Sequence, residues 1–329
     1  MSTQKPRITI VGIGLIGGSL GLALRQAEVA SAVVGHDKEP GVNNQAKKAG
    51  AVDRTEWNLI SACEKSDLVI LATPASEMQR TMEAIGPFLR PGCVVMDTAS
   101  VKLPVLAWAD EFLPEQVHFV GSDPILGAEA SAQGGLEAAR ADLFQGGVFC
   151  LTPSPSADPA AVKLVSDLTG ILGATPIFFD PAEHDGLVAA VDHLPTFLSL
   201  TLLNNLVHQP AWRELRKVAG APFEAVTQLA GTEPTALVEL FLSNKDNIVR
   251  AIDGFSASLA ALRQDLAEGE TEELAQRFGE ATEAWLKWHH DRETGQWEGD
   301  VSVQMPEKPN VLADAFLGGW WRKRRKSDE

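Results

Sequence analysis

Three glycines near the start of the chain have the spacing of a phosphate-binding loop. Gly12, Gly14 and Gly17 form a Gly-x-Gly-x-x-Gly pattern between an apolar run at 7–12 and a helical stretch at 15–26. In such a loop the first glycine permits a tight turn, the second lets the backbone approach a pyrophosphate, and the third lets the helix pack closely on the sheet. Free amides at the helix start then bind the phosphates. The pattern and its placement predict a dinucleotide site.

An acidic residue stands where such a site needs one. Asp37 follows the apolar run at 32–35 and lies 20 residues after Gly17, where a carboxylate accepts hydrogen bonds from the ribose hydroxyls. A carboxylate there repels a 2′-phosphate, so the sequence favours NAD over NADP, even with Lys38 beside it. The residues expected to bind the cofactor are Gly12, Gly14, Leu15, Ile16, Gly17, Asp37, Thr73, Pro74 and Thr98.

Polar residues also follow two later apolar runs, at 67–72 and 94–97. Ligands of open α/β sheets bind beyond the carboxyl ends of the strands, so Thr73, Thr98 and Ser100 are candidates to face the nicotinamide. Capping of the helix that follows is an equally good interpretation of each residue.

The elements that must position these residues change character near residue 180. Before it, helical stretches alternate with short apolar runs, which predicts βαβ units and a parallel sheet buried on both faces. After it, apolar residues recur at three- and four-residue intervals, which predicts helices at 182–208, 235–267 and 271–292. The predicted strands lie at 7–12, 32–35, 67–72, 94–97, 117–121, 148–152 and 176–179. We therefore expect an α/β Rossmann-type dinucleotide-binding domain over 1–180, an all-α domain over 181–292 and a tail over 293–329.

Composition excludes several classes of protein. The 329 residues include 44 acidic and 28 basic side chains, and a net charge of −16 disfavours nucleic-acid binding. The absence of tyrosine excludes the short-chain dehydrogenases, which use a catalytic tyrosine. Cys63, Cys93 and Cys150 show no metal-ligand spacing and are expected to be buried in a reducing compartment. No signal-peptide pattern is present, and the apolar stretches are expected to stop short of the ~20 residues of a membrane span. We expect a cytoplasmic protein.

The chain ends with Trp320 and Trp321 before a basic run at 322–326. Such a segment can contact anionic lipid, an acidic partner or the protein's own acidic surface. A solubilising end is the favoured interpretation, so membrane contact is not expected.

Further short motifs follow the glycine loop: Leu71-Ala72-Thr73-Pro74, Asp97-Thr98-Ala99-Ser100-Val101-Lys102, Ala141-Asp142-Leu143-Phe144, Leu151-Thr152-Pro153, Glu183-His184-Asp185, His193-Leu194-Pro195 and Ser243-Asn244-Lys245-Asp246-Asn247. With Gly12 to Leu20, they resemble the prephenate and arogenate dehydrogenases, in the same order, from residue 7 to about 290. The resemblance implies NAD-dependent oxidative decarboxylation of a cyclohexadienyl substrate in tyrosine biosynthesis. It also implies a homodimer formed through the helical domain, with the active site between the domains.

Two positions depart from the family pattern. The catalytic histidine of a Gly-x-His-Pro segment is replaced by Asp123, and the substrate arginine is replaced by Gln228. There is also extra length between Glu129 and Gly135. The resemblance therefore implies Asp123, Ser100 and His193 as catalytic residues, and Gln228 and Glu129 as substrate-binding residues.

These departures bear on the substrate. Aspartate is a weaker base than histidine near neutral pH, with an ordinary pKa of about 3.9 against about 6.5. Asp123 also adds negative charge beside a substrate that carries carboxylates, and glutamine lacks the charge and the fork of arginine. Both changes disfavour the dianion prephenate. Arogenate, or another ring that bears an amine, is a milder mismatch.

Other interpretations stay open. His193, His184 or His118 can replace Asp123 as the base, whereas His289 and His290 read as surface residues. A β-hydroxyacid dehydrogenase shares this architecture but needs a lysine about one turn before an asparagine on the first long helix, and residues 199–203 contain none. A dinucleotide-binding relic or sensor that lost its chemistry would be separated from an enzyme by a turnover assay.

Overall fold

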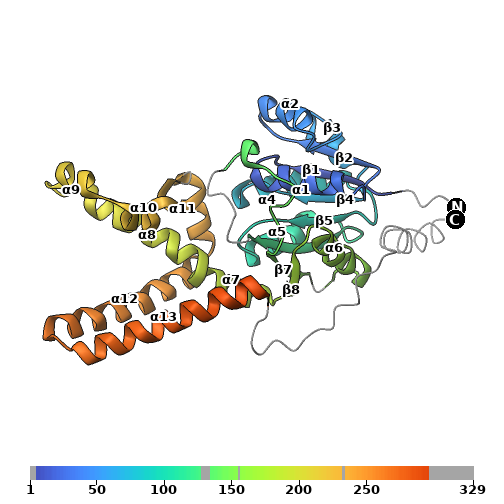
Figure 1. Ribbon diagram of the computed structural model, residues 1–329. Helices are drawn as coiled ribbons and strands as arrows, with labels where there is room; N and C mark the ends of the chain where they lie inside the picture. The colour runs from blue at the N-terminus through green and yellow to red at the C-terminus, as the bar shows by residue number, and fades with distance from the viewer. Residues whose placement is uncertain (1–4, 127–133, 155, 232–233, 296–329) are drawn as a thin grey trace.

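A computed structural model describes residues 5–126, 134–154, 156–231 and 234–295. The first half of the chain forms one eight-stranded sheet in the order β3-β2-β1-β4-β5-β6-β7-β8 (Figure 1). The strands are β1 (Arg7–Val11), β2 (Ala32–His36), β3 (Arg54–Thr55), β4 (Leu68–Leu71), β5 (Val94–Asp97), β6 (His118–Ile125), β7 (Val148–Pro153) and β8 (Thr175–Phe178). All seven predicted strands are present, and β3 is an additional strand of two residues that is too short to show a pattern.

The sheet is parallel, as predicted, except between one pair of strands. β6 and β7 pair antiparallel, while the other neighbouring strands pair parallel. A parallel connection needs a crossover of a dozen or more residues that is usually helical, whereas the described part of the β6–β7 connection holds only the short helix η2 (Leu136–Ala138). The sheet is also not buried on both faces at its β8 edge, because Phe178 is half exposed.

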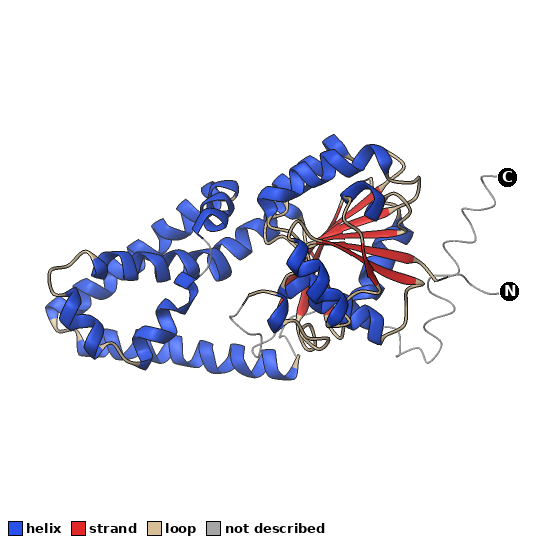
Figure 2. Ribbon diagram, turned by 90° about the horizontal axis from the view of Figure 1, so that it is seen from above, coloured by secondary structure: helices blue, strands red, loops and turns tan. Residues whose placement is uncertain are grey.

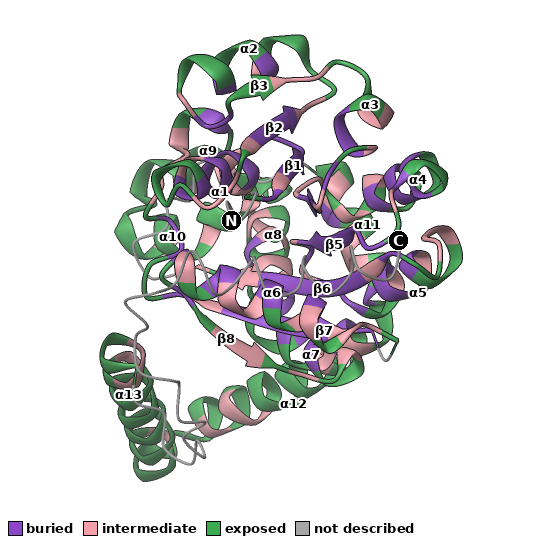
Figure 3. Ribbon diagram, turned by 90° about the vertical axis from the view of Figure 1, so that its right-hand side faces the viewer, coloured by how far each residue is buried: buried purple, intermediate pink, exposed green. Residues whose placement is uncertain are grey.

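Helices cover both faces of the sheet (Figure 2). They are α1 (Leu15–Gln26), α2 (Pro40–Lys48), α3 (Leu59–Cys63), α4 (Ala75–Ile85), the 3₁₀ turn η1 (Gly86–Phe88), α5 (Leu103–Phe112) and α6 (Pro159–Ile171). Successive residues of a strand face opposite sides. Accordingly, Ile8 and Ile10 pack with Leu20 of α1 on one face, and Val11 packs with Met78 of α4 on the other. The strands thus form the buried centre of this domain (Figure 3).

The second half of the described chain is helical, as predicted. It contains α7 (Pro181–Val188), the π-helical segment η3 (Ala189–His193), α8 (Leu194–Val207), α9 (Trp212–Val218), α10 (Ala221–Thr227), η4 (Gln228–Gly231), α11 (Pro234–Ser243), α12 (Lys245–Glu268) and α13 (Thr271–Thr294). The predicted helix at 235–267 is instead two helices separated at Asn244. Asn244 is buried, and its side chain donates to the carbonyl of Asp185, so this contact stabilises the break.

Helices α12 and α13 form a long antiparallel hairpin (Figure 1). A left-handed glycine, Gly269 at φ +75°, ends α12, and the chain turns back there. At the far end of α13, Nη2 of Arg292 donates to the carbonyl of Leu126, 2.6 Å away, just after β6. The hairpin therefore returns to the end of the strand that carries Asp123.

One helical stretch corrects the sequence expectation about apolar length. Pro181–Val207 is long and apolar enough, by length and composition, to cross a membrane, with a mean hydropathy of 1.5. However, it carries His184, Asp185 and His193, which are buried against other parts of the protein. The terminal segment with Trp320 and Trp321 lies outside the described residues.

Candidate active site

The glycine loop has the geometry that its spacing predicts. Gly12 has φ +88°, and a Cβ there would lie 2.6 Å from the carbonyl oxygen of Ala72. A Cβ on Gly17 would overlap the carbonyl oxygen of Gly12, so this position must stay bare for α1 to pack on β1. At Gly14, which begins α1 without a side-chain cap, a Cβ would meet no protein atom within 4 Å. The second glycine thus faces open space at a helix start, which fits an approaching pyrophosphate.

Asp37 lies beside this loop, at the carboxyl end of β2. Its Oδ2 accepts from the amide of Ile13 at 2.8 Å, and its Oδ1 accepts from the amide of Glu39 at 2.9 Å. Asn43 holds the Asp37 backbone through bonds of 3.1 and 2.7 Å. The carboxylate is therefore fixed next to the first turn of α1, where a ribose of a bound dinucleotide would lie.

Leu15, Ile16, Thr73, Pro74 and Thr98 lie at the same edge of the sheet. Leu15 and Ile16 form the first turn of α1, and Pro74 is the N-cap residue of α4. Thr98 Oγ1 donates to the carbonyl of Leu71 at 3.4 Å, while Thr73 Oγ1 is buried with no hydrogen-bond partner among the described residues. Their direct contact with the cofactor stays a prediction.

A glycine substitution separates cofactor binding from packing. Gly14→Ala is expected to weaken NAD binding about tenfold, or about 1.4 kcal/mol, with an unchanged melting temperature, because the new methyl group meets only ligand space. Isothermal titration with NAD and a thermal melt measure both. Gly170→Ala in α6 is a matched control, since its Cβ also meets nothing within 4 Å. Unchanged NAD affinity in Gly14→Ala would place the pyrophosphate elsewhere.

A buried ion pair joins the end of β5 to the middle of β6. Lys102 is fully buried, and its Nζ lies 2.5 Å from Oδ2 of Asp97 and 2.6 Å from the carbonyl of Ser122. Asp97 also accepts from the amides of Ala99 and Ser122, each at 2.9 Å. Burial raises the pKa of Asp97, while Lys102 and these amides act in the opposite direction. The pair fixes the strand one residue before Asp123.

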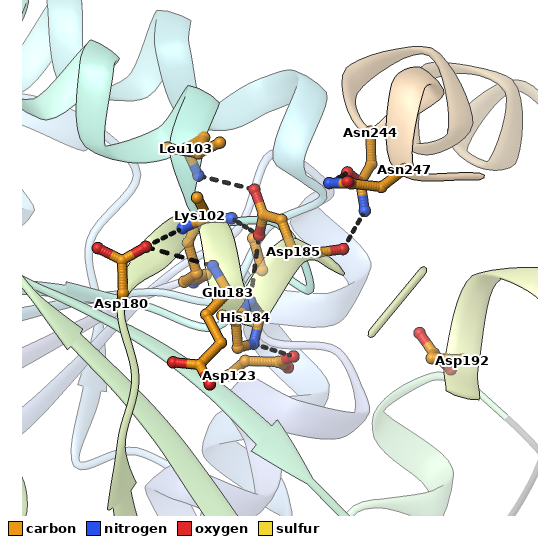
Figure 4. A network of polar contacts seen from close by, with 12 residues as sticks. Lys102, Leu103, Asp123, Asp180, Glu183, His184, Asp185, Asp192, Asn244 and Asn247 are labelled. Carbon is orange, nitrogen blue, oxygen red and sulfur yellow. Dashed lines mark hydrogen bonds and ion pairs between the residues drawn. The ribbon is translucent and has the colours of Figure 1, made fainter. Parts of the chain in front are cut away.

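Asp123 begins a line of charged groups that crosses from the sheet to the helical domain (Figure 4). Its Oδ2 lies 3.2 Å from Nε2 of His184, although the two atoms lack the alignment of a hydrogen bond. Nδ1 of His184 lies 3.1 Å from Oδ1 of Asp185. The Asp185 carboxylate accepts from the amides of Lys102 and Leu103, at 2.7 and 2.9 Å. We call Asp123, His184 and Asp185 the acid–imidazole line.

The histidine of the line is a cation. Burial lowers the pKa of His184, but the carboxylates of Asp123 and Asp185 outweigh this and raise it to about 11. His184 was expected only as an alternative base and was not among the predicted site residues. Its position in Glu183-His184-Asp185 was the available signal.

His193 differs from His184 in its charge. Burial lowers its pKa, which keeps the ring neutral at neutral pH. Its Nδ1 lies 3.3 Å from Nδ2 of Asn244, and its Nε2 is buried without a hydrogen-bond partner among the described residues. The charge of Asp123 acts to raise the pKa of His193, against the effect of burial. A catalytic role of His193 stays a prediction.

The other expected residues differ in burial and position, and their roles stay predictions. Ser100 lies partly buried in the turn between β5 and α5, at the same edge of the sheet. Gln228 is exposed at the start of η4, and within the described chain no hydrogen bond or ion pair joins it to the acid–imidazole line. Glu129 lies outside the described residues. His118 is the first residue of β6, five residues before Asp123. It therefore lies at the amino end of the strand, away from Asp123, which disfavours it as a base.

The raised pKa of His184 predicts an alkaline loss of stability. The folded chain retains this proton up to about pH 11, whereas an unfolded histidine loses it near 6.5, so stabilisation is complete below about 6.5 and disappears as pH rises through 11. Between these values the free energy of unfolding should fall by up to about 1.4 kcal/mol per pH unit. Urea unfolding at pH 7, 8, 9 and 10 measures the slope, and no tyrosine titration obscures it. His184→Gln should flatten the slope; an equal slope in that variant would contradict the assignment.

The sheet, the glycine loop and the helical domain define a two-domain, dinucleotide-binding oxidoreductase. Residues 20–177 match the model of the prephenate dehydrogenase nucleotide-binding domain, and residues 180–280 match that of the prephenate dehydrogenase dimerization domain. The chain belongs to the prephenate dehydrogenase family.

Individual relatives agree with this assignment. The chain is 27% identical to the prephenate dehydrogenase of Bacillus subtilis, over 95% of this chain and 85% of the relative. It is 27% identical to the cyclohexadienyl dehydrogenase of Zymomonas mobilis, over 88% and 99% of the two chains. The structure of A. aeolicus prephenate dehydrogenase with hydroxyphenyl propionate and NAD+ superposes with a TM-score of 0.79 at 26% identity, covering 87% and 99%. The chain is thus an NAD-dependent oxidoreductase, and the β-hydroxyacid interpretation is not needed.

Proposed function

We propose that this chain catalyses the NAD-dependent oxidative decarboxylation of a cyclohexadienyl acid, the reaction class of tyrosine biosynthesis, with Asp123 as the proton acceptor. The observation that carries the proposal is the placement of Asp123. Gly121 on β6 lies level with Asp97 at the end of β5, and Asp123 lies two residues further along β6. This is the sheet edge that bears the glycine loop. Asp123 is only 5% exposed, and its Oδ2 lacks an aligned hydrogen bond.

Each side chain of the site has a separate role in the proposed reaction. The nicotinamide of NAD, when bound, accepts the hydride from the ring carbon. Asp123 accepts the proton of the substituent on that carbon, and the ring becomes aromatic as its carboxylate leaves as carbon dioxide. His184 holds the Asp123 carboxylate from one side, and Asp185 holds His184. We expect Nε2 of His193, which lacks an aligned hydrogen bond, to bind the substrate, and the partly buried Ser100 to hold a water or the substrate.

The charges of the site bear on the choice of substrate. The carboxylates of Asp97, Asp123, Asp185 and Asp192 outnumber the two cations of this region, Lys102 and His184. The exposed Gln228 supplies no charge. A substrate with two carboxylates and no cation is therefore disfavoured. The side-chain ammonium of arogenate offsets one of those charges.

A side-by-side assay tests this choice. NADH formation at 340 nm with prephenate and with arogenate should give the higher kcat/KM for arogenate. A clear preference for prephenate would overturn the charge argument while leaving the reaction class intact.

We also propose a homodimer formed through the helical domain, in the cytoplasm. Large apolar side chains stay exposed on the hairpin, including Leu259, Leu266, Phe278, Trp285 and Leu286. Exposed apolar patches of this kind mark protein interfaces, and the match to a dimerization domain supports the same conclusion. Light scattering should give a mass near twice 35.3 kDa. A monomer at micromolar concentration would contradict the proposal.

A further inference from the structure

The carboxylate of Asp123 is unusually short of donors for a buried anion. Asp123 is only 5% exposed. Among the described residues, the cationic neighbour of Oδ2 is Nε2 of His184, which is not aligned for a hydrogen bond. A buried carboxylate with unused acceptor capacity costs free energy unless a ligand supplies donors. Nε2 of His193 is also buried and lacks an aligned hydrogen bond, with Oδ2 of the exposed Asp192 at 3.7 Å as its charged neighbour. Oδ2 of Asp123 and Nε2 of His193 therefore both keep hydrogen-bonding capacity for a ligand.

The surrounding charges favour a cation at this point. The side chain of Asp192, on η3, is 59% exposed, and the negative charge of Asp123 acts to raise the pKa of this carboxyl. Lys102 is already committed to Asp97 and the carbonyl of Ser122. His184 is shared between Asp123 and Asp185. No other described cation is paired with Asp123, so the region stays negative.

We propose that the ring substituent held by Asp123 is an amine: the site oxidises cyclohexadienyl acids in which an amino group replaces the ring hydroxyl. This inference rests on the proposed function, because it uses the same reaction and the same site. An ammonium brings a positive charge and three donors, whereas a hydroxyl brings one donor and no charge. A neutral histidine at this position suits the hydroxyl, and an aspartate suits the ammonium.

The step balances for the amine. A proton passes from the ring ammonium to Oδ2 of Asp123, and the C–H bond of the same carbon breaks with both electrons, which reduce NAD to NADH. The carbon and nitrogen are then joined by an iminium double bond. The bond between the ring and its carboxylate breaks next, and its electron pair enters the ring. The products are an aromatic amine, carbon dioxide, NADH and one proton, which Asp123 releases to solvent.

A matched pair of substrates tests the inference. Prephenate and its analogue with an amine in place of the ring hydroxyl differ only at the group that faces Asp123. The wild-type protein should show a kcat/KM about tenfold or more higher for the amine, as expected for a charged donor over a neutral one. In Asp123→His the ratio should fall by at least tenfold or invert. NAD affinity should be equal in both proteins, which verifies that the variant is folded.

The outcomes distinguish the two proposals. A wild-type ratio below one, or a ratio unchanged by Asp123→His, overturns the ring-amine assignment. If prephenate or arogenate is oxidised and the amine is not, that assignment fails and the proposed function stands. If NAD binds but none of the three compounds is oxidised, the proposed function itself fails. Should Asp123→His not fold, the wild-type ratio alone decides.

Discussion

Asp123→Asn is expected to lower kcat by a factor of about 10²–10⁴, the usual contribution of a positioned proton acceptor. The amide keeps the size of the side chain but can neither accept a proton nor balance a cation. Because Asp123 lies outside the glycine loop, NAD affinity should not change. Steady-state NADH formation with the best substrate, together with NAD titration, measures both effects.

Two controls make this result interpretable. Asp110→Asn alters an exposed carboxylate on α5, in the same domain, and should leave kcat within twofold. A thermal melt of Asp123→Asn should show a folded protein, since His184 keeps its contact with Asp185. Full activity in Asp123→Asn would remove Asp123 from the chemistry and leave His193 as the candidate base.

Lys102→Met should produce the largest change in stability, a loss of about 3–5 kcal/mol in the free energy of unfolding. The substitution leaves the carboxylate of Asp97 fully buried without its cation, and removes a donor from the carbonyl of Ser122. Removing one member of a buried ion pair is costly because the other charge stays in a medium of low polarity. Urea unfolding at pH 7 gives the difference directly.

A second variant separates charge from packing. In Asp97→Asn/Lys102→Met no charge is left unpaired, so part of the lost stability should return. Lys163→Met, which removes an exposed ion pair with Asp167 on α6, should cost less than about 1 kcal/mol. A loss below 1 kcal/mol for Lys102→Met would show that Asp97 is not held as a buried carboxylate.

The local parts of the fold were predictable from the sequence. The spacing of Gly12, Gly14 and Gly17 alone predicts the conformation of the glycine loop. The apolar runs predict the strands because buried parallel strands need continuous apolar residues. The antiparallel pairing of β6 and β7 was missed because strand direction depends on the connection, not on the strand's composition. The break at Asn244 was missed because its cause is a contact with Asp185, 59 residues away.

The candidate site was predictable only in part. Asp123 became a candidate because it departs from a family motif, and His193 because it matches one. His184 needs the fold: its charge comes from Asp123, on a strand 61 residues earlier in the chain. Lys102 was visible in the sequence, but its complete burial against Asp97 was not. Gln228 is exposed in the single chain, so its expected contact with the substrate stays a prediction.

The proposed reaction couples reduction of NAD to decarboxylation of a cyclohexadienyl ring. Its most direct test follows NADH at 340 nm and released carbon dioxide together, with the purified protein and each of prephenate, arogenate and the ring-amino analogue. We expect equal amounts of NADH, carbon dioxide and aromatic product for at least one of them. Tight NAD binding with no NADH formed from any of the three would contradict it and support a dinucleotide-binding relic.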